Sequence, residues 1–253
     1  RKTWKECGVP SPRYRVVETL TQAEQAVAAL NTWPLIVKPA DSRGGGSRGV
    51  SRIKSRSQLR DAFAFAQGYY ADPAVIIEQC LIGIEHNIET MTHNGTTRVI
   101  AVADKVKTPP PYRVDKSVDY PTKFTGDAYT RICDVACRAV RAVGITAGPA
   151  HVEMSSTDQG PMVIEMGARC GGGGTPDPIV PFVTGVDFMQ ETIRIALGQA
   201  PGNLKPVASR GCCYRFLTPL PGRLKDVINV AEVAAWEKIL DCEVLLKPGQ
   251  SIV

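Results

Sequence analysis

The sequence predicts an α+β protein that contains a substantial amount of antiparallel sheet. Apolar strand-like runs, such as PLIVK at 34–38, alternate along the chain with helix-like stretches. Some strand candidates are separated only by a short polar turn, which is typical of antiparallel pairs. The chain has 253 residues, of which 43% are hydrophobic, and this is enough for one large or two smaller buried cores.

The first third of the chain is expected to alternate strands with helices. Thr21 is the predicted N-cap of a helix, because Glu24 follows it at the spacing of a capping box. An apolar strand then leads into a glycine-rich loop, and a second strand and a second helix follow. The expected elements are a helix over 21–30, strands over 34–38 and 49–53, a helix over 57–70 and a strand over 74–79.

The middle of the chain is expected to form longer strands around one amphipathic helix. Between 127 and 143 the apolar residues recur at helical spacing, and Gly144 ends that helix. A proline-rich loop over 108–112 precedes it, and another helix starts at 184–187. That helix reaches Leu197, the segment from about 207 is expected to be mostly strand, and the remaining strands cover 84–93, 97–104, 148–156 and 161–167.

The composition excludes several classes of protein. The net charge is +5, but lysines and arginines form no dense block and aromatic residues make up only 6%, so nucleic-acid binding is not expected. No apolar run approaches the ~18–20 residues that span a bilayer, so no membrane partner is expected either. The eight cysteines show no CxxC pair and no zinc spacing, which predicts reduced thiols in a cytoplasmic protein.

A lysine followed by a glycine-rich loop is the first candidate site. Lys38 ends an apolar strand, and the sequence from Asp41 to Gly49 contains four glycines. Glycines let backbone N–H groups approach phosphate oxygens, and a nearby lysine adds positive charge. The loop is neither a P-loop nor a dinucleotide-binding fingerprint, because a strand follows it. A mobile hairpin tip is the alternative, and the loop alone does not decide between the two.

Two glutamates form the second candidate site. A hairpin centred on Gln159 places Glu153 directly opposite Glu165. Cross-strand partners have Cβ atoms about 5 Å apart, so the two carboxylates would repel each other unless a divalent cation lies between them. The same alternation puts Val163 on the glutamate face and Ile164 on the other face. The alternative is a solvated face with splayed carboxylates, and a one-residue slip of register would break the pairing.

An arginine and a run of glycines follow the second glutamate. By alternation, His151, Gly167 and Arg169 share the face of Glu153. The arginine is placed to hold a substrate carboxylate or the charge that develops on a phosphoryl group. Glycines 171–174 offer backbone amides to an anion. The alternative is a salt bridge of the arginine with a neighbouring glutamate, followed by a flexible loop.

Three further charged residues lie near predicted strand ends. Glu78 follows an apolar run and could contact the edge of an adenine, while Glu89 and Lys105 lie in later strands. Taken alone, each of the three is by default an ordinary strand-end or surface charge.

In this order, the segments resemble the ATP-grasp ligase family, most closely its carboxylate–amine ligase branch. The resemblance implies an ATP-grasp fold, in which two α+β lobes grip ATP. It implies lobes over 1–78 and 79–203, a truncated β-rich segment over 204–253, and a further N-terminal domain before Arg1. The matching segments are VKPADSRGGGSRGV, IIEQCLIGIEHNIE, DKVKTPPPY, GPAHVEMSSTDQGPMVIEMGARCGGGG and TGVDF.

The resemblance also implies a role for each candidate residue. Lys38 would contact the α- and β-phosphates of ATP, and Lys105 would approach the γ-phosphate. Glu153 and Glu165 would hold Mg²⁺ or Mn²⁺, and Arg169 would act with Lys105 in catalysis by stabilising the acyl phosphate. The other implied ATP-binding residues are Ser42, Gly44, Gly45, Gly46 and Ser47 in a lid over the phosphates, Glu78 and the backbone of Cys80 beside the adenine, and Glu85 at the ribose.

The implied reaction transfers the γ-phosphate of ATP to a small-molecule carboxylate, which an amine then attacks with release of phosphate. Many family members carry an asparagine ligand two residues after the second glutamate, where this sequence has Gly167. Two other functions stay open: a bicarbonate-using carboxylase similar to biotin carboxylase, and an ATP-binding module without catalysis. The oligomeric state, including a homodimer, is left open as well.

Overall fold

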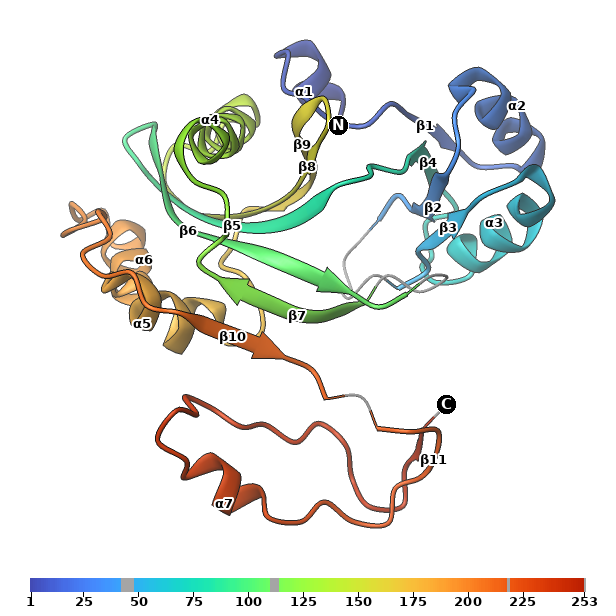
Figure 1. The fold of residues 1–253 in the computed structure, drawn as a ribbon. Helices are drawn as coiled ribbons and strands as arrows, with labels where there is room; N and C mark the ends of the chain where they lie inside the picture. The colour runs from blue at the N-terminus through green and yellow to red at the C-terminus, as the bar shows by residue number, and fades with distance from the viewer. Residues whose placement is uncertain (42–47, 110–113, 218, 253) are drawn as a thin grey trace.

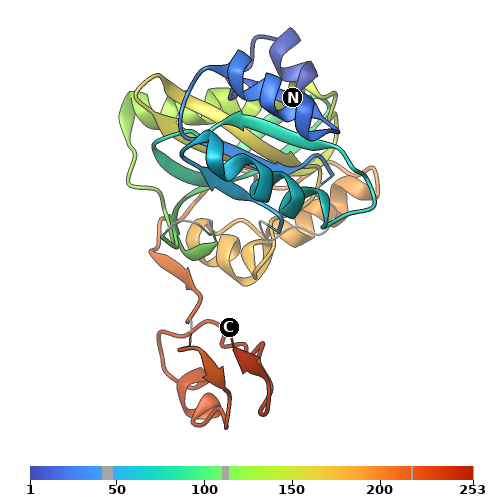
Figure 2. The ribbon, with the colours of Figure 1, turned by 90° about the vertical axis from the view of Figure 1, so that its right-hand side faces the viewer.

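The computed structural model describes residues 1–41, 48–109, 114–217 and 219–252, and it shows two lobes and a C-terminal segment (Figure 1). Within these described residues, a four-stranded antiparallel sheet forms the first lobe and a six-stranded antiparallel sheet forms the second. In Figure 2 the first lobe lies in front of the second, and the C-terminal segment hangs below both. The predicted α+β class is confirmed.

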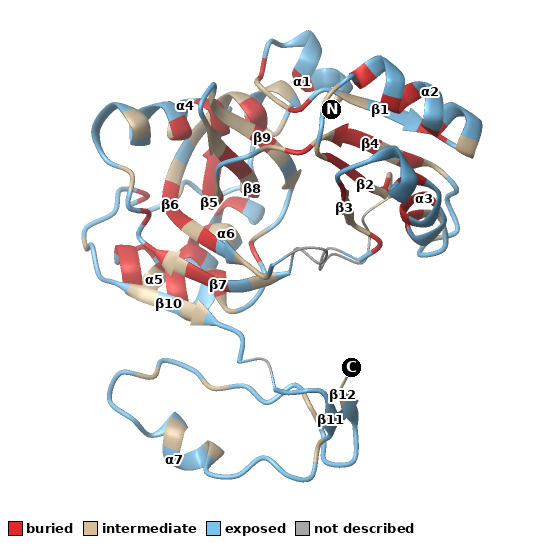
Figure 3. Ribbon diagram, turned by 45° about the vertical axis from the view of Figure 1, so that its right-hand side comes forward, coloured by how far each residue is buried: buried red, intermediate tan, exposed pale blue. Residues whose placement is uncertain are grey.

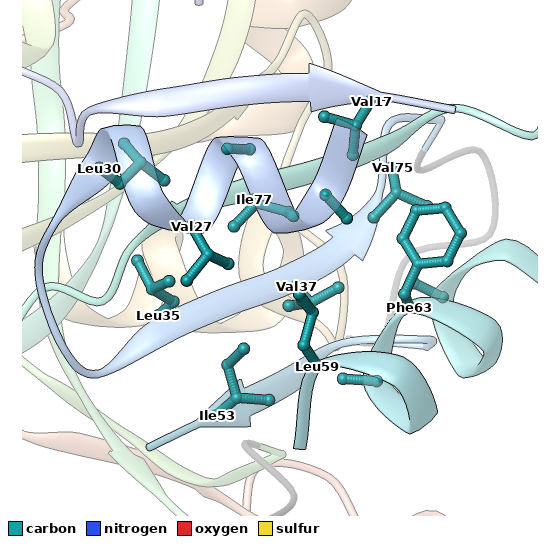
Figure 4. Packing of buried hydrophobic residues seen from close by; sticks show 14 residues of the cluster. Val17, Val27, Leu30, Leu35, Val37, Ile53, Leu59, Phe63, Val75 and Ile77 are labelled. Carbon is teal, nitrogen blue, oxygen red and sulfur yellow. The ribbon is translucent and has the colours of Figure 1, made fainter. Parts of the chain in front are cut away.

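In the first lobe, two helices cover one face of the sheet. Alternation along its second strand sends Leu35 and Val37 into the core, where side chains of the helices and the sheet point toward one another (Figure 4). The intervening Ile36 and Lys38 therefore lie on the opposite face. The elements are β1 (Tyr14–Val17), α2 (Leu20–Leu30), β2 (Leu35–Pro39), β3 (Ser51–Ile53), η1 (Arg56–Gln58), α3 (Leu59–Gln67) and β4 (Val75–Gln79), with strand order β1-β4-β2-β3.

The N-cap of α2 differs from the prediction. Thr19 caps the helix, and its hydroxyl accepts a hydrogen bond from the backbone N–H of Gln22. The side chain of Gln22 accepts one from the backbone N–H of Thr19 in return, which completes a capping box. The predicted pair of Thr21 and Glu24 is therefore wrong by two residues, because glutamine serves in the box as well as glutamate does.

In the second lobe, helices cover both faces of the large sheet. The long amphipathic helix packs on one face, and two shorter helices pack at one end of the other face, which leaves the remainder of that face for polar side chains. The elements are β5 (Ile84–His93), β6 (Thr96–Lys107), β7 (Asp115–Tyr120), α4 (Gly126–Ala142), β8 (Gly148–Thr157), β9 (Gly160–Gly167), η2 (Thr175–Ile179), α5 (Val180–Thr184), α6 (Phe188–Ala196) and β10 (Cys212–Arg215), with strand order β10-β7-β6-β5-β8-β9.

The N-terminal segment packs on the second lobe before the chain enters the first. Helix α1 (Lys2–Glu6) buries Trp4, whose indole N–H donates to the carbonyl of Ala139 at 3.1 Å. Val9 joins the same core, and the N–H of Val163 donates to the carbonyl of Pro10. The region predicted over 1–78 comprises the first lobe and the end of a preceding helix, and α1 lies where that helix end is expected.

The C-terminal segment contains little regular structure beyond β10. Its other elements are β11 (Gly222–Arg223), β12 (Ser251–Ile252) and the short helix α7 (Val230–Ala234). Most of it is exposed (Figure 3), and Leu217 and Leu220 are each 87% exposed. The prediction of a mostly β segment is therefore wrong, because these apolar residues bury no common face. Within the described ranges, we find no helix with both the length and the apolar character needed to cross a membrane.

Candidate active site

A cleft of about 440 Å³ lies between the two lobes. Its walls combine apolar side chains with a high density of charged ones, which suits a ligand that has an apolar ring and an anionic tail. The lining residues include Ile36, Lys38, Ile76, Glu78, Cys80 and Leu81 from the first lobe and the chain that leaves it, and Glu85, Lys105, Lys107, Asp115, Glu153, Ile164, Glu165 and Met166 from the second lobe.

The first-lobe wall carries a buried ion pair. The ammonium of Lys38 lies 2.8 Å from one carboxylate oxygen of Glu78, and the guanidinium of Arg1 lies 2.5 Å from the other. Glu78 is only 3% exposed, so it is not the ordinary strand-end charge that it resembles in isolation. Two cations thus hold this carboxylate, and they bring positive charge to the cleft.

The second-lobe floor carries a chain of alternating charges. Lys107 lies between Glu85, at 3.2 Å, and Asp115, at 2.8 Å. Lys105 lies between Asp115, at 3.1 Å, and Glu153, at 2.5 Å. Burial lowers the pKa of Lys105, but the two carboxylates outweigh this and raise it above its ordinary value. Neither Lys107 nor Asp115 is among the predicted site residues, and β7, on which the aspartate lies, is not among the predicted strands.

Glu153 and Glu165 pair directly opposite each other across β8 and β9, as predicted. However, the strand register that brings the two glutamates together differs from the predicted register. The hairpin runs with Met154 opposite Val163, and a β-bulge before Glu165 then shifts the register by one residue. Consequently Val163 is buried in the core beneath α4, and Ile164 lines the cleft, so the predicted faces of these two residues are wrong.

The two facing carboxyl groups have opposite pKa shifts. Burial raises the pKa of each group. For Glu153, the positive charge of Lys105 and the nearby imidazole of His151 outweigh burial and bring the pKa well below its ordinary range. For Glu165, the negative charge of Glu153 adds to burial, so its pKa is raised. A divalent cation would relieve this conflict, and carboxylate oxygens are ligands that Mg²⁺ and Mn²⁺ prefer, so the pair fits such an ion.

A second buried carboxylate lies beside this pair on the same sheet. Glu89 is fully buried, and the Nδ1 atom of His151 lies 2.5 Å from its Oε1. The backbone N–H of Gly171 donates to the other oxygen at 3.2 Å. Burial lowers the pKa of His151, but Glu153 and Glu89 raise it to about 9 overall. The reading of Glu89 as an ordinary strand-end charge is therefore wrong.

The glycine-rich segment after β9 is packed against protein atoms. A Cβ atom at Gly171 would lie 2.5 Å from Oε1 of Glu89, and one at Gly173 would lie 2.8 Å from the ring of Tyr214. Because the Gly171 amide already bonds Glu89, it is not a free anion-binding donor as predicted. Arg169 is exposed, and its guanidinium donates to the carbonyl of Cys170 at 2.7 Å; it is not among the residues that line the cleft.

A model of the ATP-grasp domain family matches residues 31–177, which is more than half of the chain. The chain belongs to the ATP-grasp family. The uncharacterized protein y4rH of Sinorhizobium fredii is 30% identical over 100% of this ATP-grasp chain and 52% of its own length. A D-alanine–D-alanine ligase of Methylibium petroleiphilum is 26% identical over 79% of the chain and 65% of its own length.

Solved structures agree with this membership. The L-amino acid ligase of Bacillus licheniformis superposes with a TM-score of 0.84 at 26% identity, over 100% of this chain and 61% of that one. The VanG D-Ala:D-Ser ligase of Enterococcus faecalis, with a TM-score of 0.65 at 21% identity over 78% of this chain and 59% of that one, shares the fold. The predicted family and fold are confirmed, and the chain spans about half to two thirds of these relatives.

Some predicted ATP-binding residues are not placed by the structure, and one differs in detail. The lid residues lie outside the described part of the chain, so their role stays a prediction: Ser42, Gly44, Gly45, Gly46 and Ser47. Cys80 lines the cleft, but its backbone N–H already donates to the carbonyl of Pro34 at 3.1 Å. Of its backbone groups, the carbonyl oxygen is therefore the better candidate for a contact with adenine.

Proposed function

We propose that this ATP-grasp chain binds ATP and a divalent cation in its cleft and carries out ADP-forming ligation of a small-molecule carboxylate with an amine. The observation that carries the proposal is the carboxylate pair of Glu153 and Glu165. It lies in one cleft with Lys105 on its own lobe and Lys38 on the other. Phosphoryl transfer depends mainly on positioning and on neutralising phosphate charge, and these groups supply both.

In this proposal, each part of the cleft has a separate task. Lys38, held by Glu78, binds the α- and β-phosphates, and Lys105 approaches the γ-phosphate. The cation bound by the two glutamates would supply positive charge to the phosphate oxygens. The apolar walls, together with Glu78, Cys80 and Glu85, accept the adenosine. Ser42, Gly44, Gly45, Gly46 and Ser47 are further phosphate-binding residues in this proposal. Arg169 stabilises charge at the acyl-transfer end.

The reaction has two bond-forming steps. A carboxylate oxygen of the acid attacks the γ-phosphorus of ATP, the bond to the β-phosphate oxygen breaks, and ADP leaves. The amine nitrogen then attacks the carbonyl carbon of the acyl phosphate, loses a proton and displaces inorganic phosphate. We propose amino acids as the first substrates to test, because similar chains include an L-amino acid ligase and D-alanine–D-alanine ligases.

The thiols support a cytoplasmic location for this activity. All eight cysteines of the sequence lie in the described ranges, and none of them forms a disulfide there. Reduced cysteines in such number are typical of reducing compartments. We therefore place the reaction in the cytoplasm, with no nucleic acid or membrane as a partner.

The decisive experiment measures ADP release by the protein that contains this chain. Mg·ATP is supplied with pooled amino acids in one arm and with bicarbonate in a second arm. Release that requires amino acids supports the ligase, and release with bicarbonate alone would make the protein a carboxylase. Saturable ATP binding without ADP release in any arm would contradict the proposal and favour a binding module.

A further inference from the structure

The reaction proposed above leaves one buried cation of the cleft without a task. The side chain of Arg1 is only 10% exposed and lines the cleft, although it belongs to neither sheet. The helix that follows it, α1, is fixed on the second lobe by Trp4, and the guanidinium carbon of Arg1 lies 5.9 Å from the centre of the indole ring. A guanidinium held over an aromatic face in this way has a restricted orientation.

The two terminal nitrogens of this guanidinium bind different lobes. One donates to a carboxylate oxygen of Glu78, in β4 of the first lobe, at 2.5 Å. The other donates to the main-chain carbonyl of Val163, in β9 of the second lobe, at 3.0 Å. An arginine suits this task because its planar fork presents several N–H donors in a fixed geometry, whereas a lysine ammonium is a single point charge. Arg1 is therefore a direct link between the lobes.

On the first lobe, the link reaches the lysine that is proposed to bind phosphate. Glu78 accepts Arg1 with one carboxylate oxygen and pairs with the ammonium of Lys38 through the other, at 2.8 Å. The side chain of Glu78 is 4% exposed, so solvent and salt screen these contacts little. The position of the Lys38 ammonium thus depends on Glu78, which Arg1 holds from its other side.

On the second lobe, the link reaches the strand that carries Glu165. Val163 lies directly before Ile164, the extra residue of the bulge, and Glu165 follows it. Within the described ranges β9 is an edge strand, and the N–H of Val163 donates to the carbonyl of Pro10 at 2.8 Å. The N-terminal segment thus binds both main-chain polar groups of Val163. It anchors β9 at the point where the bulge brings Glu165 opposite Glu153.

We propose that Arg1 is a positioning residue, which sets the placement of Lys38 relative to Glu153 and Glu165 by linking the two lobes. The inference rests on the proposed function, because it concerns the groups that bind phosphate and the cation there. Phosphoryl transfer depends mainly on how such groups are placed, and a displacement of about 1 Å can lower the rate about 10²-fold. Arg1 acts in this role without a contact to ATP.

Turnover and ATP binding, measured separately in the protein that contains this chain, test the role. We expect R1Q to lower kcat for ADP formation with the pooled amino acids, per ATP-binding site, by about 10²-fold. The Kd for a non-hydrolysable ATP analogue with Mg²⁺ should change much less, because Lys38 and the glutamates remain. R1K should stay about tenfold slower than the wild type, because an ammonium does not reproduce the fork. The matched control is K2Q, at a neighbouring side chain that is 85% exposed, and it should match the wild type.

A second measurement, of the distance between the lobes, does not depend on turnover. Genetically encoded spin labels report this distance by double electron–electron resonance. One label replaces Glu24, on the exposed face of α2, and the other replaces Arg131, on the exposed face of α4. We expect one narrow distance distribution in the ligand-free wild type and in K2Q, and a broader distribution in R1Q.

Three results would overturn the inference. A distance distribution in R1Q equal to that of the wild type would show that Arg1 does not link the lobes. A kcat that falls only in proportion to the number of ATP-binding sites lost would reduce Arg1 to a role in stability. Full activity of R1K would reduce it to a source of charge. If the wild type forms ADP, all three leave the proposed function intact. If the wild type forms no ADP, the proposed function fails, and the distance measurement alone decides whether Arg1 links the lobes.

Discussion

Glu78 and Glu165 line the same cleft from opposite lobes, yet their surroundings are opposite. Glu78 lies between the cations Lys38 and Arg1, at 2.8 and 2.5 Å. Glu165 instead faces another carboxylate, Glu153, which raises its pKa. The cations of the fold neutralise the charge of Glu78. The carboxylate of Glu165, in contrast, lies next to a second negative charge. This difference separates a carboxylate that is paired by cations of the chain itself from one that, in the proposed function, is paired by a bound cation.

The largest effect should follow from replacement of Glu165 by glutamine. We expect E165Q to lower metal-dependent turnover by about 10³-fold, because it removes one of the two charged ligands that we propose for the metal ion in phosphoryl transfer. The midpoint of thermal unfolding should not fall, since the substitution also removes a like-charge contact. Steady-state ADP release and a thermal melt measure the two quantities.

The matched control for this variant is D158N, at the exposed tip of the same hairpin. We expect D158N to change neither the metal-dependent turnover nor the midpoint of thermal unfolding. A fall in the unfolding midpoint of E165Q, with turnover unchanged, would remove Glu165 from the metal site and make it equivalent to Glu78.

The next largest effect should come from Glu78 and should appear in stability. We expect E78Q to lower the free energy of unfolding by about 3 kcal/mol, because removing one partner of a buried ion pair leaves its cations unpaired. Urea denaturation measures the change. E24Q, on the exposed face of α2, is the control and should stay within about 0.5 kcal/mol of the wild type. Equal stability of the two variants would contradict the structural role of Glu78.

Glu89 is a third carboxylate of the second lobe, and like Glu78 it has bonding partners within the fold. We expect G171A to cost about 2 kcal/mol in unfolding free energy, because the added Cβ would lie 2.5 Å from the carboxylate of Glu89. G172A is the matched control, since nothing lies within 4 Å of its added Cβ. Denaturation curves that coincide for the two variants would show that the loop does not close tightly on Glu89.

The smallest effect should be a pH dependence of stability in the metal-free protein. The folded pKa of Glu165 is raised above the ordinary value of 4.5, so the folded state binds more protons, and the unfolding free energy should fall as the pH rises above 4.5. Glu153 has a lowered pKa and acts in the opposite sense, below that value. Urea denaturation in chelator at a series of pH values checks both directions.

The variant E165Q isolates the contribution of Glu165 to this profile. We expect the decline above pH 4.5 to be weaker in E165Q than in the wild type, and Mn²⁺ should also weaken it in the wild type. Identical profiles for the two proteins would mean that the charge conflict between Glu153 and Glu165 has no energetic consequence.

The parts of the site that the sequence reveals are those encoded locally. Lys38 ends an apolar strand, and the two glutamates flank a short polar turn, so period and spacing suffice to place them on neighbouring strands. The bulge at Ile164 is not visible in the sequence. The strands near the turn pair one residue away from the predicted register, so Val163 and Ile164 have the faces opposite to those predicted. The extra residue of the bulge restores the predicted register from Glu165 onward.

The missed parts depend on contacts between distant segments. The segment DKSVDY of β7 has too many polar residues to suggest a buried strand, yet Asp115 is held there by lysines of β6. Glu89 is equally unremarkable in sequence, and its burial follows from His151, which is 62 residues away. The C-terminal segment shows the reverse case. Its apolar residues beyond β10 suggest further strands, but in the described part of that segment only the two-residue strands β11 and β12 pair.

The N-terminal crossing described above has a mechanical consequence. The first lobe is tethered to the second by two stretches of chain, one leading from Pro10 to β1 and one leading from β4 to β5. The two run side by side, and the N–H of Gln79 donates to the carbonyl of Arg13 at 2.9 Å. Two connections on the same side of the lobe restrict the ways in which the first lobe could rotate against the second. They keep Lys38 on the wall of the cleft that also contains Glu153 and Glu165.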